Sequence, residues 1–114
     1  MQMLITEDIL KNFLKENSAD FALVINYSGS LLTSVNVDND DSIAAMSAAI
    51  ISMSNKYLED LEKDSLKQMV IKTASSIVIF AKIDDEKVVV IAANISANLG
   101  MILHQSELLA KKLI

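Results

Sequence analysis

Apolar and polar positions repeat along this chain with two different periods, and the switches between them predict eight elements. Apolar residues recur at helical spacing over about residues 6–17, 42–61 and 98–113. The runs between these helices are rich in β-branched residues and predict strands at residues 20–27, 30–37, 66–73, 75–83 and 87–94. The order is α-β-β-α-β-β-β-α, which indicates an α+β fold with a five-stranded antiparallel sheet.

Residues that favour helix starts and turns fall between these elements. Thr6, followed by acidic residues, suits the start of the first helix, and Ser28-Gly29 allows a tight turn between the first two strands. The acidic stretch "DNDDS" precedes the second helix, and Ser96 or Asn98 can cap the third. The pair of strands richest in β-branched residues is expected in the middle of the sheet. Three helices must cover two sheet faces, so one helix covers a face alone.

The helix at residues 42–61 carries more apolar and small residues than a single buried face requires. We assign its larger arc to the sheet, namely Ile43, Met46, Ile50, Tyr57 and Leu61. A second face, centred on Ala44, Ala48 and Ile51, is interpreted as the surface that contacts a partner helix, because small residues allow close approach. The alternative is that alanine merely favours helix formation, which leaves Ile51 unexplained. The simplest partner is a second copy across a two-fold axis.

Composition narrows the class of protein. The 114 residues contain no proline, two glycines and no linker-like stretch, so we expect a single domain over residues 1–114. Hydrophobic residues make up 52%, which is high for a short chain and fits apolar surface covered by a partner. The net charge is −5 and every basic residue is lysine, which argues against nucleic-acid binding. No apolar run reaches the length of a membrane span, and we expect a cytoplasmic protein without membrane contact.

The residues that usually carry catalysis are scarce. The chain has no cysteine and one histidine, His104, without a nucleophile partner in sequence. No phosphate-binding glycine loop and no metal-ligand spacing is present. The acidic residues near the end of the second helix are interpreted as a solvated surface. We therefore expect no enzyme activity, no metal and no cofactor.

Three stretches carry a resemblance to a known family. They are the "NYSG" turn after the first strand, the alanine-rich central helix, and "ANISANLGMIL" leading into the last helix. Together with the order of elements, they resemble the roadblock family, also called the dynein light chain 7 family, over about residues 5–113. The most specific piece is Asn98-Leu99-Gly100.

The resemblance implies an architecture and a dimer. The long second helix would lie on one face of the sheet and the terminal helices on the other. Two copies, or this chain and another roadblock-like chain, would pack their second helices antiparallel and join their third strands into one sheet. The interface residues expected on this basis are Ala44, Ala48, Ile51, Met69 and Ile71.

The resemblance also implies a function. Family members are small non-catalytic modules that bind and regulate Ras-like small GTPases or act as scaffolds. The partner surface is expected at Ser52, Asn55, Lys56, Glu59 and Asp60. Because the chain has no arginine, it cannot supply an arginine finger. The alternative is a structural assembly subunit that pairs with another roadblock-like chain and does not contact a GTPase.

Overall fold

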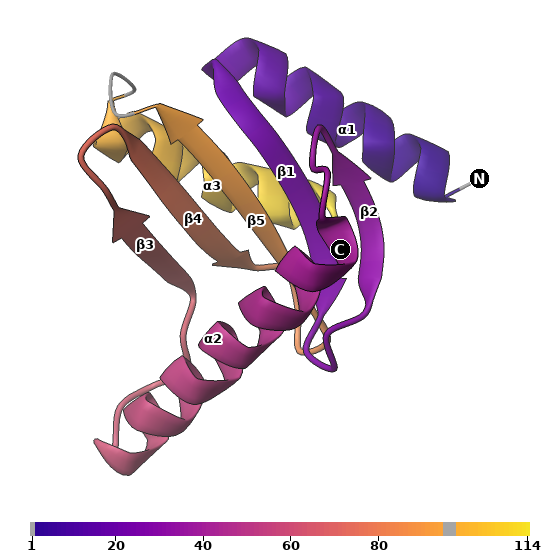
Figure 1. Ribbon diagram of the computed structural model, residues 1–114. Helices are drawn as coiled ribbons and strands as arrows, with labels where there is room; N and C mark the ends of the chain where they lie inside the picture. Colours follow the sequence, from indigo (N-terminus) through magenta and orange to yellow (C-terminus); the bar gives the residue numbers. More distant parts are fainter. Residues whose placement is uncertain (1, 95–97) are drawn as a thin grey trace.

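The protein is described by a computed structural model that covers residues 2–94 and 98–114. Three layers are visible in Figure 1: a twisted sheet, one long helix on one side, and two helices on the other. The elements are α1 (Gln2–Asn17), β1 (Ala19–Asn26), β2 (Leu31–Val35), α2 (Asp40–Asp60), β3 (Gln68–Lys72), β4 (Ser76–Lys82), β5 (Lys87–Asn94) and α3 (Leu99–Lys112). The predicted α+β order and the five-stranded antiparallel sheet are confirmed.

The sheet has the strand order β2-β1-β5-β4-β3, and every neighbouring pair is antiparallel. Strand β5 lies at the centre, as its run of valine and isoleucine predicted, and its residues from Val88 to Ala93 are buried. A strand that is covered on both faces needs apolar side chains at successive positions, which explains why β5 does not alternate. Strands β2 and β3 form the two edges.

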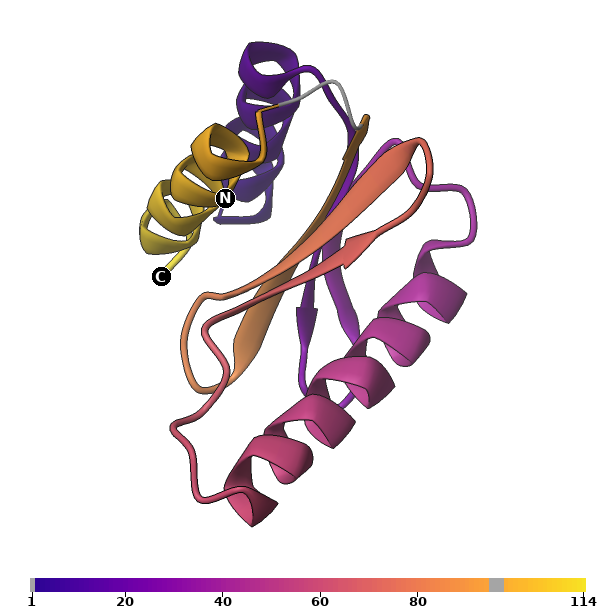
Figure 2. The same cartoon turned by 90° about the vertical axis from the view of Figure 1, so that its left-hand side faces the viewer.

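Each face of the sheet has its own core. Helices α1 and α3 cover one face, where Leu10, Phe13 and Leu109 pack on alternate residues of β1, β4 and β5. Helix α2 lies alone on the opposite face, as Figure 2 shows, and packs mainly on β1 and β2. The expectation that one helix covers a face by itself is confirmed.

Helix α1 starts earlier than predicted, and one of the two predicted caps of α3 is confirmed. Helix α1 begins at Gln2, so Thr6 lies inside the helix rather than at its cap. At α3, the Asn98 side chain caps the helix by accepting a hydrogen bond from the Met101 backbone N–H at 2.9 Å. The alternative cap, Ser96, falls outside the described residues. Helix α2 starts after Asn39, with Asp40 and Asp41 in its first turn, where the helix dipole favours negative charge.

The predicted orientation of α2 is wrong. Ala44, Ser47, Ala48 and Ile51 are buried against the sheet of the same chain. The residues assigned to the sheet point largely outward instead: Met46, Ile50, Tyr57 and Leu61 are exposed, and only Ile43 is half-buried.

The reason for the reversal is the close approach of the β1–β2 turn. Gly29 adopts φ +94°, and a Cβ added there would lie 3.5 Å from the Ala45 Cα and 3.8 Å from the Ala48 Cβ. Small residues on α2 therefore let this turn and the sheet approach the helix. Ala44, Ala48 and Ile51 belong to the core of one chain, and their expected role in a dimer interface is corrected.

Candidate protein interaction surface

The flank of α2 that faces β3 is apolar and has no covering element in the part of the chain that the structure describes. Met53 is 75% exposed and Tyr57 is 65% exposed, and both extend a row with Ile50 and Leu61. These positions recur at spacings of three and four residues, so they share one side of the helix. Exposed methionine, isoleucine and tyrosine in a continuous row are typical of a surface that another protein covers.

A groove of about 640 Å³ runs between this flank and the edge strand β3. Its walls come from α2, from the segment that follows α2, and from β3, and they are almost entirely apolar. The lining residues are Ala49, Ile50, Met53, Ser54, Tyr57, Leu58, Leu66 and Met69. The Ser54 hydroxyl lies 3.4 Å from the Met69 sulfur and connects the helix to the strand.

Strand β3 continues this apolar surface at the edge of the sheet. Met69 and Ile71 point to the α2 side, where Ile71 is 40% exposed and Met69 is half-buried. Gln68 points the other way, because its side-chain amide donates to the Leu103 carbonyl of α3 at 2.8 Å. Met69 and Ile71, expected from sequence at an interface, are therefore placed together on an uncovered face.

Most residues expected to bind a partner protein lie on the opposite flank of α2. With about 3.6 residues per turn, Ser52, Lys56 and Glu59 fall on the side turned away from β3, whereas Asp60 lies at the border of the apolar flank, close to the side of Met53. All four are exposed. Lys56 and Asp60 form an ion pair at 3.0 Å.

Asn55 differs from the rest of this set. Its side-chain oxygen accepts a hydrogen bond from the Leu66 backbone N–H at 2.9 Å, so it anchors the segment that links α2 to β3. Its structural task is therefore to hold one wall of the groove in place.

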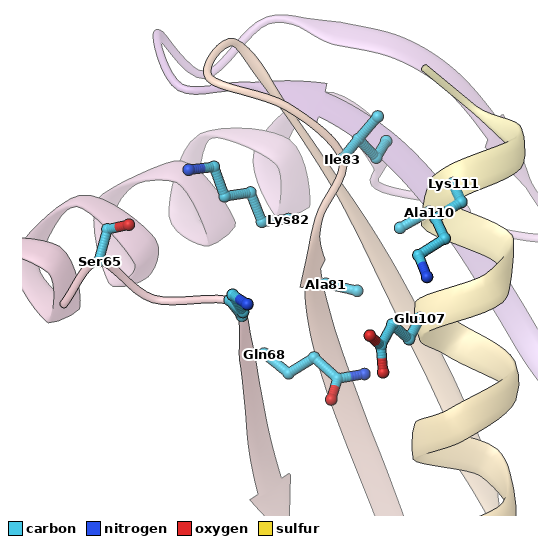
Figure 3. A pocket seen from close by; sticks show the side chains of 9 residues that line it. Ser65, Gln68, Ala81, Lys82, Ile83, Glu107, Ala110 and Lys111 are labelled. Carbon is cyan, nitrogen blue, oxygen red and sulfur yellow. The ribbon is translucent and has the colours of Figure 1, made fainter.

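A second cleft, of about 380 Å³, lies between the β3–β4 strands and the second half of α3 (Figure 3). Gln68 and Glu107 approach each other across it, whereas Lys82 points away toward α2. Lys82 pairs instead with Asp85 at 3.3 Å. The cleft is lined by amide, ammonium, carboxylate, hydroxyl and aliphatic groups, and His104 lies exposed on α3 outside it.

In the β4–β5 turn, the Asp84 carboxylate accepts hydrogen bonds from two backbone N–H groups. Burial favours the neutral form of Asp84, but the backbone N–H groups of Glu86 and Lys87 and the Lys87 ammonium outweigh this effect and lower the pKa of Asp84. Nearby, burial and then the charges of Asp84 and Asp85 raise the pKa of the Tyr27 phenol. These interactions fix the turn between two strands rather than forming a catalytic pair.

The described residues form neither a metal site nor a membrane-spanning helix. Within residues 2–94 and 98–114, no group of three or more His, Asp or Glu side chains is arranged to hold a metal ion. None of the helices described is long and apolar enough to cross a membrane.

The geometry defines a class of protein: a small α+β domain with an apolar helix flank beside the edge strand β3 of its sheet. A family model described as the roadblock/LC7 domain matches residues 5–93. The chain therefore belongs to the roadblock/LC7 family, as its resemblance predicted.

Solved structures agree on the fold. Myxococcus xanthus MglB superposes with a TM-score of 0.91 at 14% identity, covering 97% of this chain and 86% of that chain. The gliding protein MglB of Thermus thermophilus gives 0.89 at 16% identity, covering 98% and 87%. A roadblock/LC7 domain from Streptomyces avermitilis gives 0.87 at 14% identity, covering 94% and 92%. A search of curated proteins finds no significant match.

Sequence reasoning missed the groove and its central residues, Met53, Leu58 and Leu66. The signal was present in the spacing of Ile50, Met53 and Tyr57, which places large apolar side chains on one side of the helix. It was masked because the arc of larger residues, which includes Ile50 and Tyr57, was assigned to the sheet on the basis of residue size. In this fold the sheet selects small residues, and the exposed flank carries the large ones.

Proposed function

We propose that this protein is a non-catalytic dimeric regulator or scaffold that binds a Ras-like small GTPase. The observation that carries the proposal is the apolar surface formed by the outer flank of α2 and the free edge of β3 on a roadblock fold. Membership of the roadblock/LC7 family supports a regulatory or scaffold role.

A second copy of this chain is the partner that best fits the apolar surface. Helix α2 packs mainly over β1 and β2, so the other half of the same sheet face is open at β3 and β4. That open half presents Met69, Ile71 and the half-buried Val78. In a two-fold dimer the helix of each protomer approaches the open half of its partner's sheet face, and both apolar flanks are covered together. One two-fold contact therefore covers both the apolar flank of α2 and the open half of the sheet face in each protomer.

The GTPase is proposed to bind on the polar flank of α2. Ser52, Lys56 and Glu59 stay exposed when the apolar flank is covered, because they lie on the other side of the helix, and Asp60 lies at the border between the two flanks. Asn55 supports this surface from beneath by fixing the segment after α2. Since the chain contains no arginine, any effect on hydrolysis comes from positioning the catalytic groups of the GTPase itself.

The second candidate function is that of a structural assembly subunit. The same apolar flank and free strand edge also fit a different roadblock-like chain, which would leave the polar flank without a GTPase. The two functions differ in whether the polar flank of α2 is needed for binding.

The test is a pull-down from native lysate with immobilised protein, run in parallel with GDP and with a non-hydrolysable GTP analogue. The proposal predicts that mass spectrometry identifies a Ras-like GTPase enriched in one nucleotide state. The variant Glu59→Lys should lose that GTPase, and Glu16→Lys, which makes the same charge change on the exposed side of α1, serves as the matched control. Recovery of roadblock-like chains alone, unchanged by nucleotide and by both variants, would favour the assembly subunit.

A further inference from the structure

The hydrogen-bonding groups of β3 divide into two sets. The Lys82 backbone N–H donates to the Lys67 carbonyl at 2.8 Å, and the Thr73 N–H donates to the Ser76 carbonyl at 2.8 Å. Both contacts turn odd-numbered residues of this strand toward β4. Successive residues of a strand point their backbone groups in opposite directions, so Gln68, Val70 and Lys72 direct theirs to the open edge.

The open edge can accept a second strand in only a few antiparallel registers. When a strand pairs with its own copy across a two-fold axis, hydrogen-bonded pairs form between residues that both point outward. Centring the axis on Val70 opposes Val70 to itself and Gln68 to Lys72, and every outward-facing backbone group of β3 finds a partner. Centring it on Met69 leaves Lys72 without a partner inside β3, and centring it on Ile71 leaves Gln68 without one.

Side-chain chemistry selects the same register. With the axis on Val70, Met69 stands opposite Ile71 on the α2 face, and the polar Gln68 stands opposite Lys72 on the α3 face. With the axis on Met69, the Lys67 ammonium would stand opposite the apolar Ile71. With the axis on Ile71, Lys72 would stand opposite Val70. Directly opposed residues are the pairs that stabilise a sheet. Only the register centred on Val70 places apolar residues opposite apolar ones and polar residues opposite polar ones on both faces.

The direction of the strands follows from the position of α2. An axis perpendicular to the sheet makes the two β3 strands antiparallel and keeps both copies of α2 on the same face. Parallel pairing would place the two α2 helices on opposite faces and leave both apolar flanks uncovered. The exposed row at Ile50, Met53 and Tyr57 therefore favours the antiparallel arrangement.

We propose that two copies of this chain join through β3 in an antiparallel ladder centred on Val70, with Met69 of each protomer opposite Ile71 of its partner. This inference rests on the proposed dimer and adds the register that determines which strands can pair. A partner strand with a charge at the position of Met69 or Ile71 is rejected, because the charge would be buried beneath the α2 pair.

Single cysteines can report the register, because the chain contains no cysteine of its own. Odd-numbered residues form non-hydrogen-bonded pairs across the proposed ladder, where Cβ atoms lie about 4.5 Å apart, close enough for a disulfide. The single variants Met69→Cys and Ile71→Cys are each expressed alone, and they are also co-expressed as two separate chains. The proteins are then oxidised and examined by non-reducing gel and intact mass. Glu16→Cys on the exposed side of α1 controls for random oxidation.

The proposed register predicts cross-linking only when the two variants are combined. About half of the chains should then cross-link, which is the share of mixed dimers that random pairing gives. Self-cross-linking of Met69→Cys would place the axis on Met69, and self-cross-linking of Ile71→Cys would place it on Ile71. Either result overturns the inference.

The solution mass of the reduced variants separates this failure from failure of the dimer. Dimeric variants that cross-link in no combination would show that β3 does not lie at the two-fold axis, and the register would be wrong while the dimer stands. Monomeric variants, with a monomeric parent protein, would overturn both. Thermal unfolding of each variant verifies that the substituted edge strand still folds.

Discussion

At the scale of single residues, the size of a side chain on α2 determines which side of the helix can touch the sheet. Ala48 lies beside the β1–β2 turn, within van der Waals distance of a Cβ added to Gly29, and Ala44 is completely buried against the sheet. Ile51 fills the remaining space at the centre of that face and is completely buried. The sequence pattern assigned the larger residues of α2 to the sheet, whereas in the structure the small residues face the sheet and most of the large ones are exposed.

Ala48→Lys should destabilise the fold rather than separate a dimer. The substitution places an ammonium group between α2 and the sheet, and we expect the free energy of unfolding to fall by on the order of 3 kcal/mol or more. Chemical denaturation followed by circular dichroism measures this change. Ser52→Lys, on the exposed flank, is the control and should stay within about 0.5 kcal/mol of the parent protein.

Asp84 should make a small part of the stability depend on pH. Its lowered pKa means that the folded state favours the carboxylate, so its contribution is complete above the ordinary value of 3.8 and is lost as the pH falls through the lower folded value. Asp84→Asn removes this titration. The parent protein should lose more unfolding free energy than the variant below pH 3.8, by less than about 1 kcal/mol because the side chain is partly exposed. Parallel pH profiles for the two proteins would show that Asp84 makes no such contribution.

At the scale of elements, the sequence predicts the architecture because two periodicities are clear. The strands and helices are recovered in order, and the β-branched run of β5 correctly predicts the central strand. The orientation of α2 could not be recovered, because apolar residues nearly encircle the helix and periodicity alone does not say which arc faces the sheet. The approach of the β1–β2 turn decides it, and that is a tertiary contact.

The polar flank of α2 was only partly predictable for a related reason. Ser52, Lys56, Glu59 and Asp60 are exposed as their chemistry suggests. Asn55 has the same polar character but serves a backbone N–H of Leu66, a residue 11 positions further along the chain. No local pattern in the sequence distinguishes an asparagine that binds a partner from one that fixes a loop.

Asn55→Ala should weaken the connection between α2 and β3. Removal of its side-chain oxygen leaves the half-buried Leu66 N–H without its acceptor, at a cost of about 1–2 kcal/mol in unfolding free energy. Lys56→Ala breaks an exposed ion pair and should cost below about 0.5 kcal/mol. Equilibrium denaturation of both variants makes the comparison, and equal costs would argue that the Asn55 contact is not structural.

The apolar flank of α2 should control self-association without controlling folding. Met53 is 75% exposed in one chain, so Met53→Lys should leave the thermal unfolding of the monomer nearly unchanged. Burying that lysine in a dimer is unfavourable, and we expect dimerisation to weaken by at least about 10-fold. Sedimentation over a concentration series measures the dissociation constant. An unaltered constant for Met53→Lys would place the interface elsewhere, and Ser52→Lys controls for the added charge.

At the scale of the whole molecule, one helix covers only part of one face of a five-stranded sheet, and the open part is apolar. Helices α1 and α3 cover one side of the sheet, and α2 covers only part of the other side. The high hydrophobic content of the sequence has the same origin, because residues that serve an interface are added to those that serve the core. In the proposed dimer, the partner covers this open part of the sheet.

The most direct test of this account is the solution mass of the unmodified protein, measured by light scattering after gel filtration. One chain has a mass of 12.5 kDa, and the account predicts a particle of twice that mass at micromolar concentration. A mass of 12.5 kDa under the same conditions would contradict the homodimer and would leave the apolar surface of α2 and β3 to a different chain.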